Sequence, residues 1–343
     1  MRAQLIKKIQ GIKKDSKPLV LGDIPEPIPD GNELLIKVHA CGVCHTELDE
    51  IEGRTVPPVL PIVPGHQVIG RVIATQARDS RFEIGDRVGA GWIYSSCGKC
   101  EYCIEGNDNL CQDFKATGRD ANGGYAEYMK IPENSAFLIP DIFSDSEAAP
   151  LLCAGAVGYR ALKLTNSVDG DLIGLTGFGA SGHIVLKTIK YKFPLSKIFV
   201  FARSSKEQEF AKELGADWAG DITESSPEKL NSIIDTTPVW TPIIESLKNL
   251  KPSGRLVINA IRKEDIDKKY LTKINYSEHL WMEKEIKSVA NVSVNDIKEF
   301  MEIASQIPIK PEFQEYSLAD ANKALIELKE GKIRGGKVIT INN

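Results

Sequence analysis

The sequence contains no apolar run long enough to cross a bilayer and no surplus of basic residues. A transmembrane helix needs roughly 20 consecutive apolar residues, a length that no stretch reaches. Lys and Arg number 43 against 47 Asp and Glu, for a formal charge of −4, which gives no electrostatic reason to expect a nucleic-acid or anionic-membrane partner. The N-terminus, MRAQLIKKIQGIKK, also lacks the apolar core of a secretory signal. We therefore expect a cytoplasmic protein.

Internal repeats and low-complexity tracts are also absent, and a length of 343 residues predicts two domains rather than one core. Before about residue 145, short strands are expected between Pro and Gly turns, at 33–40, 66–75 and 82–91. Beyond it, strands alternate with helices, which predicts an α/β fold with a parallel sheet covered on both faces. The expected strands are 197–202, 231–237, 254–260, 285–292 and 337–341. The expected helices include 144–163, with Ser144 or Ser146 as its N-cap, 206–216, and one capped at Ser317 that stops at Gly331.

Six of the seven cysteines lie in two short stretches, which favours metal binding in a reducing compartment over a disulfide framework. Four of them are Cys97, Cys100, Cys103 and Cys111. Four thiolates satisfy a tetrahedral zinc ion and leave no exchangeable position, which describes a structural site. An iron–sulfur cluster is the chemical competitor, but the ferredoxin run has three residues before its fourth Cys and a Pro after it. Here seven residues precede the fourth Cys and Gln112 follows it.

A second group of metal-binding residue types lies in residues 38–72. Cys41, Cys44 and His45 fall within five residues, and His66 follows between a Pro-Gly turn and an apolar run. Thiolate sulfur and imidazole nitrogen are preferred zinc ligands. Taken alone, the stretch also fits buried cysteines that act as small apolar residues and a histidine in the core. The four-cysteine run and the Gly-rich motif below favour the functional interpretation.

A GxGxxG motif, formed by Gly177, Gly179 and Gly182, follows an apolar strand and opens a helix. This is the context that dinucleotide binding requires. The first Gly permits the tight turn, the second allows backbone to approach a pyrophosphate, and the third allows close packing of helix on strand. The helix N-terminus then faces the phosphate charge.

The residues after the second strand favour NADP(H) over NAD(H). An acidic side chain there would accept the ribose hydroxyls of NAD, but this chain has Arg203, Ser204, Ser205 and Lys206. An arginine can donate two hydrogen bonds to a 2′-phosphate. The alternative is a solvated turn in which Ser204 or Ser205 caps the following helix.

Together these motifs closely resemble the zinc-containing alcohol dehydrogenases of the medium-chain dehydrogenase/reductase superfamily, along essentially the whole chain. The resemblance implies a GroES-like, β-rich catalytic domain at 1–154 and 290–343, with a structural-zinc lobe at 91–118, and a Rossmann domain with a doubly wound parallel sheet at 155–289. The matching stretches are CGVCHTE (41–47), PGH (64–66), the four-cysteine run, GGYAEY (123–128), LLCAG (151–155), GFGASG (177–182) and KIRGGKVI (332–339).

The resemblance also implies a catalytic zinc held by Cys44, His66 and Cys153, and therefore two zinc ions per chain. Three protein ligands leave the fourth position for water or a substrate oxygen, as a Lewis-acid site requires. The implied reaction is hydride transfer between a small alcohol or aldehyde and NAD(P)(H). Cys41 is left over and is expected to be a buried apolar filler.

Other roles follow from the same resemblance. Thr46 matches the hydroxyl that starts the family's proton relay, His45 a position near the cofactor pyrophosphate, and Arg334 a late phosphate-binding arginine. Trp92 matches the aromatic residue that narrows the substrate pocket. Family members are commonly homodimers or homotetramers, and the sequence does not decide between them.

Three positions depart from the family pattern. Glu47 replaces the Asp that orients the zinc-binding histidine and is one methylene longer. Gln67 replaces a Glu after that histidine, and Asp49 stands where many members have a relay histidine. The proton therefore passes either to Asp49 or from a ribose hydroxyl to water.

Two other classes of protein remain open. A zinc-free quinone reductase shares the fold but has no use for the three ligands of the catalytic site. A zinc-stabilised binding protein would explain the four-cysteine run but not GxGxxG, and the acidic balance argues against a basic binding face. About two zinc ions per chain would support the dehydrogenase, and about one would leave either rival.

Overall fold

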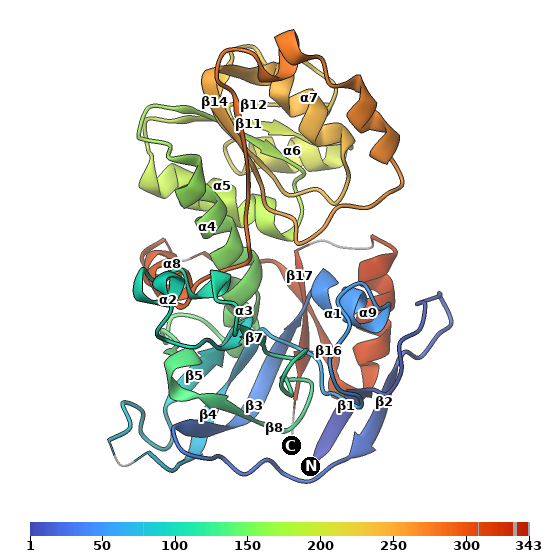
Figure 1. The fold of residues 1–343 in the computed structure, drawn as a ribbon, viewed down its shortest axis with the longest axis vertical. Helices are drawn as coiled ribbons and strands as arrows, with labels where there is room; N and C mark the ends of the chain where they lie inside the picture. The colour runs from blue at the N-terminus through green and yellow to red at the C-terminus, as the bar shows by residue number, and fades with distance from the viewer. Residues whose placement is uncertain (78, 308, 332–334, 342–343) are drawn as a thin grey trace. The chain divides into compact units, whose positions relative to one another are not determined.

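The computed structural model describes residues 1–77, 79–307, 309–331 and 335–341. The chain forms two compact units (Figure 1): Met1–Ala156 with Val292–Asn343, and Val157–Asn291. These limits lie two residues from the predicted domain boundaries. That the first unit is catalytic and the second binds the nucleotide remains a prediction. Within the described ranges, no helix combines the length and apolarity needed to cross a membrane.

The first unit is built on one large sheet, which combines strands from the N-terminal half of the chain with strands from its C-terminal end. Its order is β16-β17-β3-β4-β5-β9, and β8 also pairs with β3. The last described strand, β17, runs antiparallel to β3, whose residues are mostly buried. In Figure 1 the red C-terminal strands accordingly lie beside the blue N-terminal ones. The strands are β3 (Glu33–Val43), β4 (Val68–Thr75), β5 (Arg87–Ala90), β8 (Tyr128–Pro132), β9 (Ala136–Leu138), β16 (Phe313–Ser317) and β17 (Gly336–Thr340), with two smaller pairs, β1 (Arg2–Ile6) with β2 (Leu19–Asp23) and β6 (Ile93–Ser95) with β7 (Lys115–Ala116).

The strand expected at 82–91 is shorter than predicted and begins only at Arg87. The residues before it form a turn, in which Asp86 Oδ2 accepts a hydrogen bond of 2.8 Å from the Glu83 N–H. Gly85 has a φ of +98°, which a strand residue does not adopt. The prediction was too long because Phe82 extends the apolar pattern of the sequence. Phe82 is indeed buried in the core, but it does not belong to a strand.

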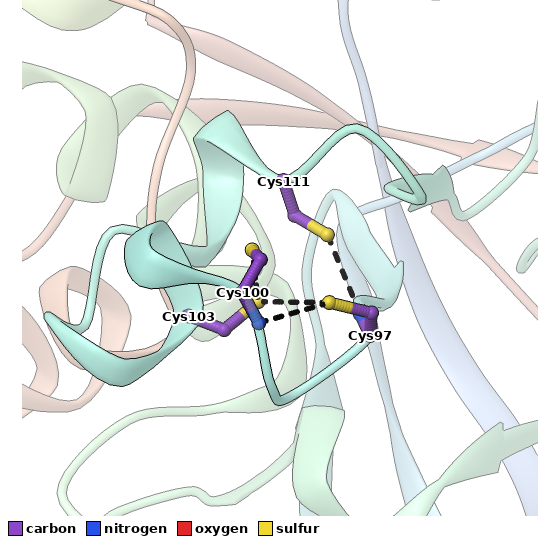
Figure 2. Close-up of side chains that lie close together, drawn as sticks. All are labelled: Cys97, Cys100, Cys103 and Cys111. Carbon is purple, nitrogen blue, oxygen red and sulfur yellow. Dashed lines mark hydrogen bonds between the residues drawn. The ribbon is translucent and has the colours of Figure 1, made fainter.

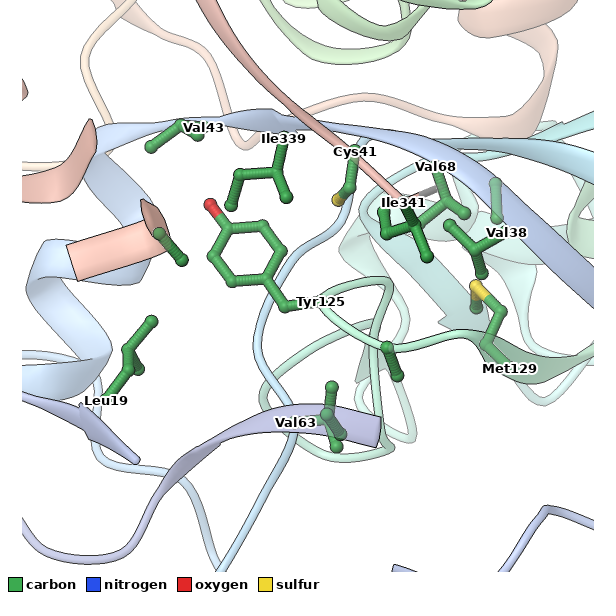
Figure 3. Packing of buried hydrophobic residues seen from close by; sticks show 14 of the residues in the cluster. Leu19, Val38, Cys41, Val43, Val63, Val68, Tyr125, Met129, Ile339 and Ile341 are labelled. Atoms are coloured by element: carbon green, nitrogen blue, oxygen red, sulfur yellow. The ribbon is translucent and has the colours of Figure 1, made fainter. Parts of the chain in front are cut away.

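A hydrophobic core around Tyr125 supports the sheet of the first unit. Its ring lies close to Val43, Ile339 and Cys41 (Figure 3). Cys41 is fully buried in this cluster, and burial raises the pKa of its thiol well above the usual value. The leftover cysteine is therefore an apolar filler, as the sequence predicts.

The second unit contains a six-stranded parallel sheet of order β12-β11-β10-β13-β14-β15. Numbered within the unit, this order is 3-2-1-4-5-6, the doubly wound arrangement that the alternation of strands and helices predicts. The elements are β10 (Leu172–Thr176), α5 (Ala180–Lys192), β11 (Lys197–Phe201), α6 (Ser205–Glu213), β12 (Trp218–Gly220), β13 (Leu230–Asp235), α7 (Thr241–Asn249), β14 (Leu250–Ile258) and β15 (Glu285–Ser288).

Neighbouring residues of each central strand belong to different hydrophobic clusters, so both faces of this sheet are covered. Val200 and Ile234 pack with the side chains of α5, whereas Phe201 and Ile233 pack with those of α7. Successive side chains on a strand point to opposite faces. The continuous apolar runs of these strands follow from burial on both sides.

The helix expected from residue 144 has Ser144, one of its two candidate caps, as the N-cap. Ser144 Oγ accepts a hydrogen bond of 3.2 Å from the Glu147 N–H, and the Glu147 carboxylate accepts one from the Ser144 N–H. The helical run has three parts: α3 (Asp145–Pro150), a π-helical turn, η3 (Leu151–Gly155), and α4 (Ala156–Thr165). Single π-turns are often found at functional sites, and this one carries Cys153.

The C-terminal segment contains α8 (Val294–Gln306) and α9 (Ala321–Lys329). The expected cap at Ser317 lies one short turn earlier, at the start of η6 (Leu318–Asp320), where its Oγ accepts from the Asp320 N–H at 3.3 Å. Gly331, at a φ of +71°, follows the end of α9 as predicted.

Glu52 links the end of α1 (His45–Ile51) to the C-terminal helix. Its Oε1 accepts hydrogen bonds from Lys329 Nζ and from the Ile12 N–H, the latter at 3.0 Å. Its Oε2 accepts from Arg54 at 2.6 Å. Although burial raises the pKa of Glu52, the hydrogen bonds from Lys329, Ile12 and Arg54 lower it to about 2.

We expect Glu52→Gln to lower the free energy of unfolding at neutral pH by about 1–2 kcal/mol, between the values typical of a charge-assisted hydrogen bond and of a surface ion pair. Because the folded-state pKa is depressed, the stabilisation is fully present above the ordinary pKa of 4.5 and is lost as pH falls toward 2. Urea denaturation at pH 7, 4 and 3 measures the difference in free energy of unfolding between wild type and Glu52→Gln, with Glu26→Gln, at an exposed residue, as control. If Glu52→Gln remained less stable than wild type by the same free energy at all three pH values, the ion pair of Glu52 would not be the source of the stabilisation.

Candidate functional site

Three side chains from separate segments of the first unit meet at one point. Cys44 is the N-cap of α1, His66 precedes β4, and Cys153 lies in the π-helical turn η3. His66 Nε2 is 3.3 Å from Cys153 Sγ, and the two sulfurs are 4.0 Å apart. All three potential ligand atoms lie within 4.8 Å of one another. The structure therefore brings together the three residues expected to bind a catalytic metal.

The spacing of these atoms fits a zinc ion. Two sulfurs at about 2.3 Å from a tetrahedral zinc would be about 3.8 Å apart, and a sulfur and a nitrogen about 3.5 Å apart. The distances of 4.0 and 3.3 Å differ from these values by only a few tenths of an ångström. Thiols and imidazole are zinc donors. Because the group supplies three ligand atoms, a tetrahedral zinc ion would have its fourth position open to an oxygen or nitrogen atom of another molecule.

Glu47 fixes the orientation of the His66 ring. Its Oε1 is 2.7 Å from His66 Nδ1, and its Oε2 accepts a hydrogen bond of 2.7 Å from the Cys44 N–H. Both Glu47 and His66 are at most 1% exposed. Holding Nδ1 leaves Nε2 to face the sulfurs, which is the usual arrangement around a metal-binding histidine. The longer side chain thus retains the contact, because it folds back across the first turn of α1.

These three side chains shift one another's pKa values. A hydrogen bond from Cys153 lowers the pKa of the Cys44 thiol well below its usual value, and His66 lowers it further. The same contact with Cys44, together with burial, raises the pKa of Cys153. Burial lowers the pKa of His66, but Glu47 and Cys44 together raise it well above the usual value. A metal that binds deprotonated ligands would displace the protons that these groups hold.

Glu50 is a buried carboxyl that the sequence analysis missed. Its side chain is 0% exposed, and within the described part of the chain neither oxygen has a hydrogen-bond partner. Burial raises its pKa well above the usual value, and Glu47 raises it further. The available signal was the spacing of Glu47 and Glu50, which places both on one face of a helix.

Two further predicted residues contact the group, and a third, Asp49, lies on the same helix as Thr46. Thr46 is 4% exposed, and its Oγ1 lies 3.6 Å from Cys44 Sγ. Trp92 is also buried and contacts the His66 ring edge-on, with ring centroids 5.0 Å apart. Asp49 is 1% exposed and accepts from Arg54 at 2.6 and 2.7 Å. The ion pair gives Asp49 a structural contact, and its part in proton transfer remains a prediction.

The four remaining cysteines form a second potential metal group (Figure 2). Cys103 Sγ lies 3.9 Å from Cys97 Sγ and 3.5 Å from Cys100 Sγ, and Cys111 Sγ accepts from the Cys97 N–H at 3.4 Å. Backbone N–H groups of Lys99 and Cys100 lower the pKa of Cys97 to about 6, which favours a thiolate. Because all four potential ligands are sulfurs, this group has the composition of a closed structural site.

The Gly-rich turn of the second unit has the predicted geometry. Gly177 has a φ of +78°, and Gly179 is the N-cap of α5. A Cβ on Gly182 would lie 2.8 Å from the Gly177 carbonyl oxygen, so only Gly allows this packing.

The cofactor-selecting residues follow β11. Arg203 is exposed, and Ser204 is the N-cap of α6, accepting a hydrogen bond of 3.3 Å from the Glu207 N–H. The capping role of Ser204 does not prevent Arg203 from binding a phosphate. Of the other predicted cofactor residues, His45 is exposed at the start of α1, and Arg334 lies outside the described residues.

Comparisons with known proteins agree with this arrangement. Residues 30–141 match the family described as Alcohol dehydrogenase GroES-like domain. The chain is 39% identical to the probable alcohol dehydrogenase AdhA of Mycobacterium tuberculosis, over 95% of this chain and 94% of that protein. It is 30% identical to an alcohol dehydrogenase of Geobacillus stearothermophilus, over 96% and 98%.

A solved structure has the same fold over nearly the whole chain. The cinnamyl alcohol dehydrogenase of Sorghum bicolor superposes with a TM-score of 0.83 at 25% identity, over 99% of this chain and 97% of that one. Sequence and fold therefore agree along both units, and the chain belongs to the zinc-type medium-chain dehydrogenase/reductase family, with the alcohol dehydrogenases.

Proposed function

We propose that this protein is a zinc-dependent alcohol dehydrogenase or aldehyde reductase that uses NADP(H) in preference to NAD(H). The observation that carries the proposal is the convergence of Cys44, His66 and Cys153 in a chain related to alcohol dehydrogenases. When bound there, zinc supplies a Lewis acid that polarises a carbonyl or stabilises the charge of an alcohol oxygen.

The protein side chains would prepare the site for that chemistry. Glu47 keeps the His66 ring turned so that Nε2 faces the two sulfurs. Thr46, beside Cys44, would take the proton of the alcohol and pass it on, because a hydroxyl can donate while it accepts. Asp49 or water would receive it. Trp92, packed against His66, would limit the size of the substrate.

The two cysteine groups should differ in what their loss does. We expect the purified protein to hold about two zinc ions per chain. Cys153→Ala should lose one zinc ion and alcohol oxidation while keeping its thermal stability nearly unchanged. Cys100→Ala should lose the other zinc ion and show a lower Tm, because that zinc organises a loop with few apolar contacts.

Elemental analysis, circular dichroism melting and NADP-linked oxidation of a panel of alcohols measure these effects. Cys41→Ala is the matched control, since it removes a buried thiol outside both groups and should retain both metals. Near-normal turnover by Cys153→Ala would refute the catalytic assignment. About one zinc ion in the wild type, lost in Cys100→Ala, would favour a zinc-free quinone reductase or a zinc-stabilised binding protein.

Cofactor preference should depend on Arg203. Removing its hydrogen bonds to the 2′-phosphate should cost about 1.5–3 kcal/mol, so Arg203→Ala should weaken NADPH binding roughly 10- to 150-fold. The Kd of NADH, which lacks that phosphate, should change much less. Fluorescence titrations of both cofactors test this, with Lys212→Ala, an exposed cation on the helix that follows Arg203, as control. An equal loss for the two cofactors would show that Arg203 does not bind the phosphate.

We also propose a homo-oligomer, a dimer or tetramer, that forms through the free edge of the second unit's sheet. β15 ends the sheet, and all four of its residues are exposed. Trp281 and Tyr276, which precede it, are 55% and 63% exposed. An exposed edge strand beside apolar side chains is suited to pairing with a second copy of the same strand.

Ile286→Lys and Trp281→Lys should therefore shift the mass in light scattering toward the 37.7 kDa of a single chain, because each places a charge in the apolar contact. Leu195→Lys, at an apolar residue that is 77% exposed elsewhere in this unit, should leave the mass unchanged. Wild-type protein that is already monomeric, or variants that retain the oligomer, would rule out this interface.

A further inference from the structure

A buried ion pair lies at the carboxyl edge of the second unit's sheet. Asp235, the last residue of β13, is 0% exposed, and the Lys263 side chain is 7% exposed. The Lys263 ammonium contacts Asp235 Oδ2 and donates to the carbonyl oxygens of Thr237, at 2.6 Å, and Val239, at 3.2 Å. An ammonium group has three donors, so these three acceptors satisfy it.

The other oxygen of Asp235 holds the strand that leads into the Gly-rich turn. Asp235 Oδ1 accepts from Thr176 Oγ1 at 2.6 Å and from Thr237 Oγ1 at 2.7 Å. Thr176 ends β10 and directly precedes Gly177. A Cβ on Gly177 would lie 2.9 Å from both Thr236 Oγ1 and Thr237 Cγ2. The ion pair and the phosphate-binding turn are therefore parts of one packed assembly.

Two loops are joined by the same contacts. The Asn259 N–H donates to the Asp235 carbonyl at 2.7 Å, and the Glu264 N–H donates to the Pro238 carbonyl at 2.6 Å. Lys263 thus connects segment 259–264, after β14, to segment 236–240, after β13. Both segments leave the carboxyl ends of neighbouring parallel strands, where doubly wound sheets bind their ligands.

The strand order assigns these loops to one half of a dinucleotide. The chain proceeds from β10 to β11 on one side and from β13 to β14 on the other, so the order reverses between β10 and β13. A dinucleotide lies across such a switch point with one nucleotide over each half of the sheet. Arg203 follows β11 and so marks the adenosine side. Asp235 and Lys263 lie on the nicotinamide side.

A stabilising role alone accounts poorly for this pair. Burying two charges costs free energy that their attraction often does not recover, and apolar residues of similar volume are frequently as stable. The pair instead fixes the geometry of two loops through specific directional bonds. A binding site needs such directional bonds when its backbone groups must be held in one fixed position to contact a ligand.

We propose that Lys263, together with Asp235, is a positioning residue that holds segments 236–240 and 259–264 in the shape that receives the nicotinamide half of the cofactor. The proposal rests on the dinucleotide binding proposed above. Lys263 itself takes no part in the chemistry, because its donors are occupied by protein acceptors.

The test separates the two halves of the cofactor. The Kd of NADPH and the Kd of adenosine 2′,5′-bisphosphate, which lacks the nicotinamide half, are measured by calorimetry on the zinc-loaded protein. Lys263→Met should weaken NADPH tenfold or more and leave adenosine 2′,5′-bisphosphate within about twofold. Arg203→Ala should weaken both ligands. NADH and ADP form a second pair of probes that does not depend on the 2′-phosphate.

Two further variants guard against simple destabilisation. The double variant Lys263→Met, Asp235→Asn removes both charges but keeps an acceptor for Thr176 and Thr237. It should therefore fold even if Lys263→Met alone does not. It should still bind NADPH poorly. Lys337→Met removes a similarly buried ammonium from the first unit, where it contacts Tyr316 and Glu327. That control should lower Tm without changing either Kd.

The outcomes distinguish this inference from the function on which it rests. Wild-type protein that binds no nicotinamide dinucleotide would overturn the proposed function. Wild-type protein that binds NADPH, with Lys263 variants that leave its Kd unchanged or weaken both ligands equally, would overturn only the role of Lys263. Selective loss of the nicotinamide-bearing ligand is the result that supports it.

Discussion

The contact between Glu47 and His66 is the constraint on which the candidate catalytic site depends. Both side chains are buried, and their attraction must offset the cost of removing two polar groups from water. The carboxylate also accepts the N–H of Cys44, so one residue positions two potential ligands and caps the helix between them. A change at Glu47 would therefore disturb the start of α1 and the metal group together.

The third ligand depends on a different kind of constraint. Cys153 lies in a π-helical turn within an otherwise regular helical run. A π-turn inserts one residue and so changes the direction of the side chains that follow. Gly155, in the same turn, packs against Phe300, and a Cβ there would lie 2.2 Å from its ring. Helix α8, from the end of the chain, thus restricts where this turn can lie.

The sequence predicted most of the fold because the informative features are local. Alternation of strands with helices, the cap at Ser144 and the GxGxxG turn each depend on a few neighbouring residues. It did not place the short strands β1, β2, β6, β7, β8 and β9, or β16 (Phe313–Ser317). The residues of β16 are mostly exposed and so show no clear apolar alternation. It extended β5 through a turn because Phe82 is buried without being in a strand.

The site shows the same division between local and distant information. Residues 38–72 contain Cys44, Glu47 and His66 and by themselves suggest a metal site. Only the resemblance to a known family added Cys153, which is far from them in the sequence. Asp235 and Lys263 belong to no motif and are separated by helix α7, strand β14 and two loops, so only the fold brings them together. Glu50 is an ordinary helix residue until its burial is known. Charged residues that become buried are thus the class that sequence patterns reveal least, because their significance lies in solvent exclusion, a property of the folded chain.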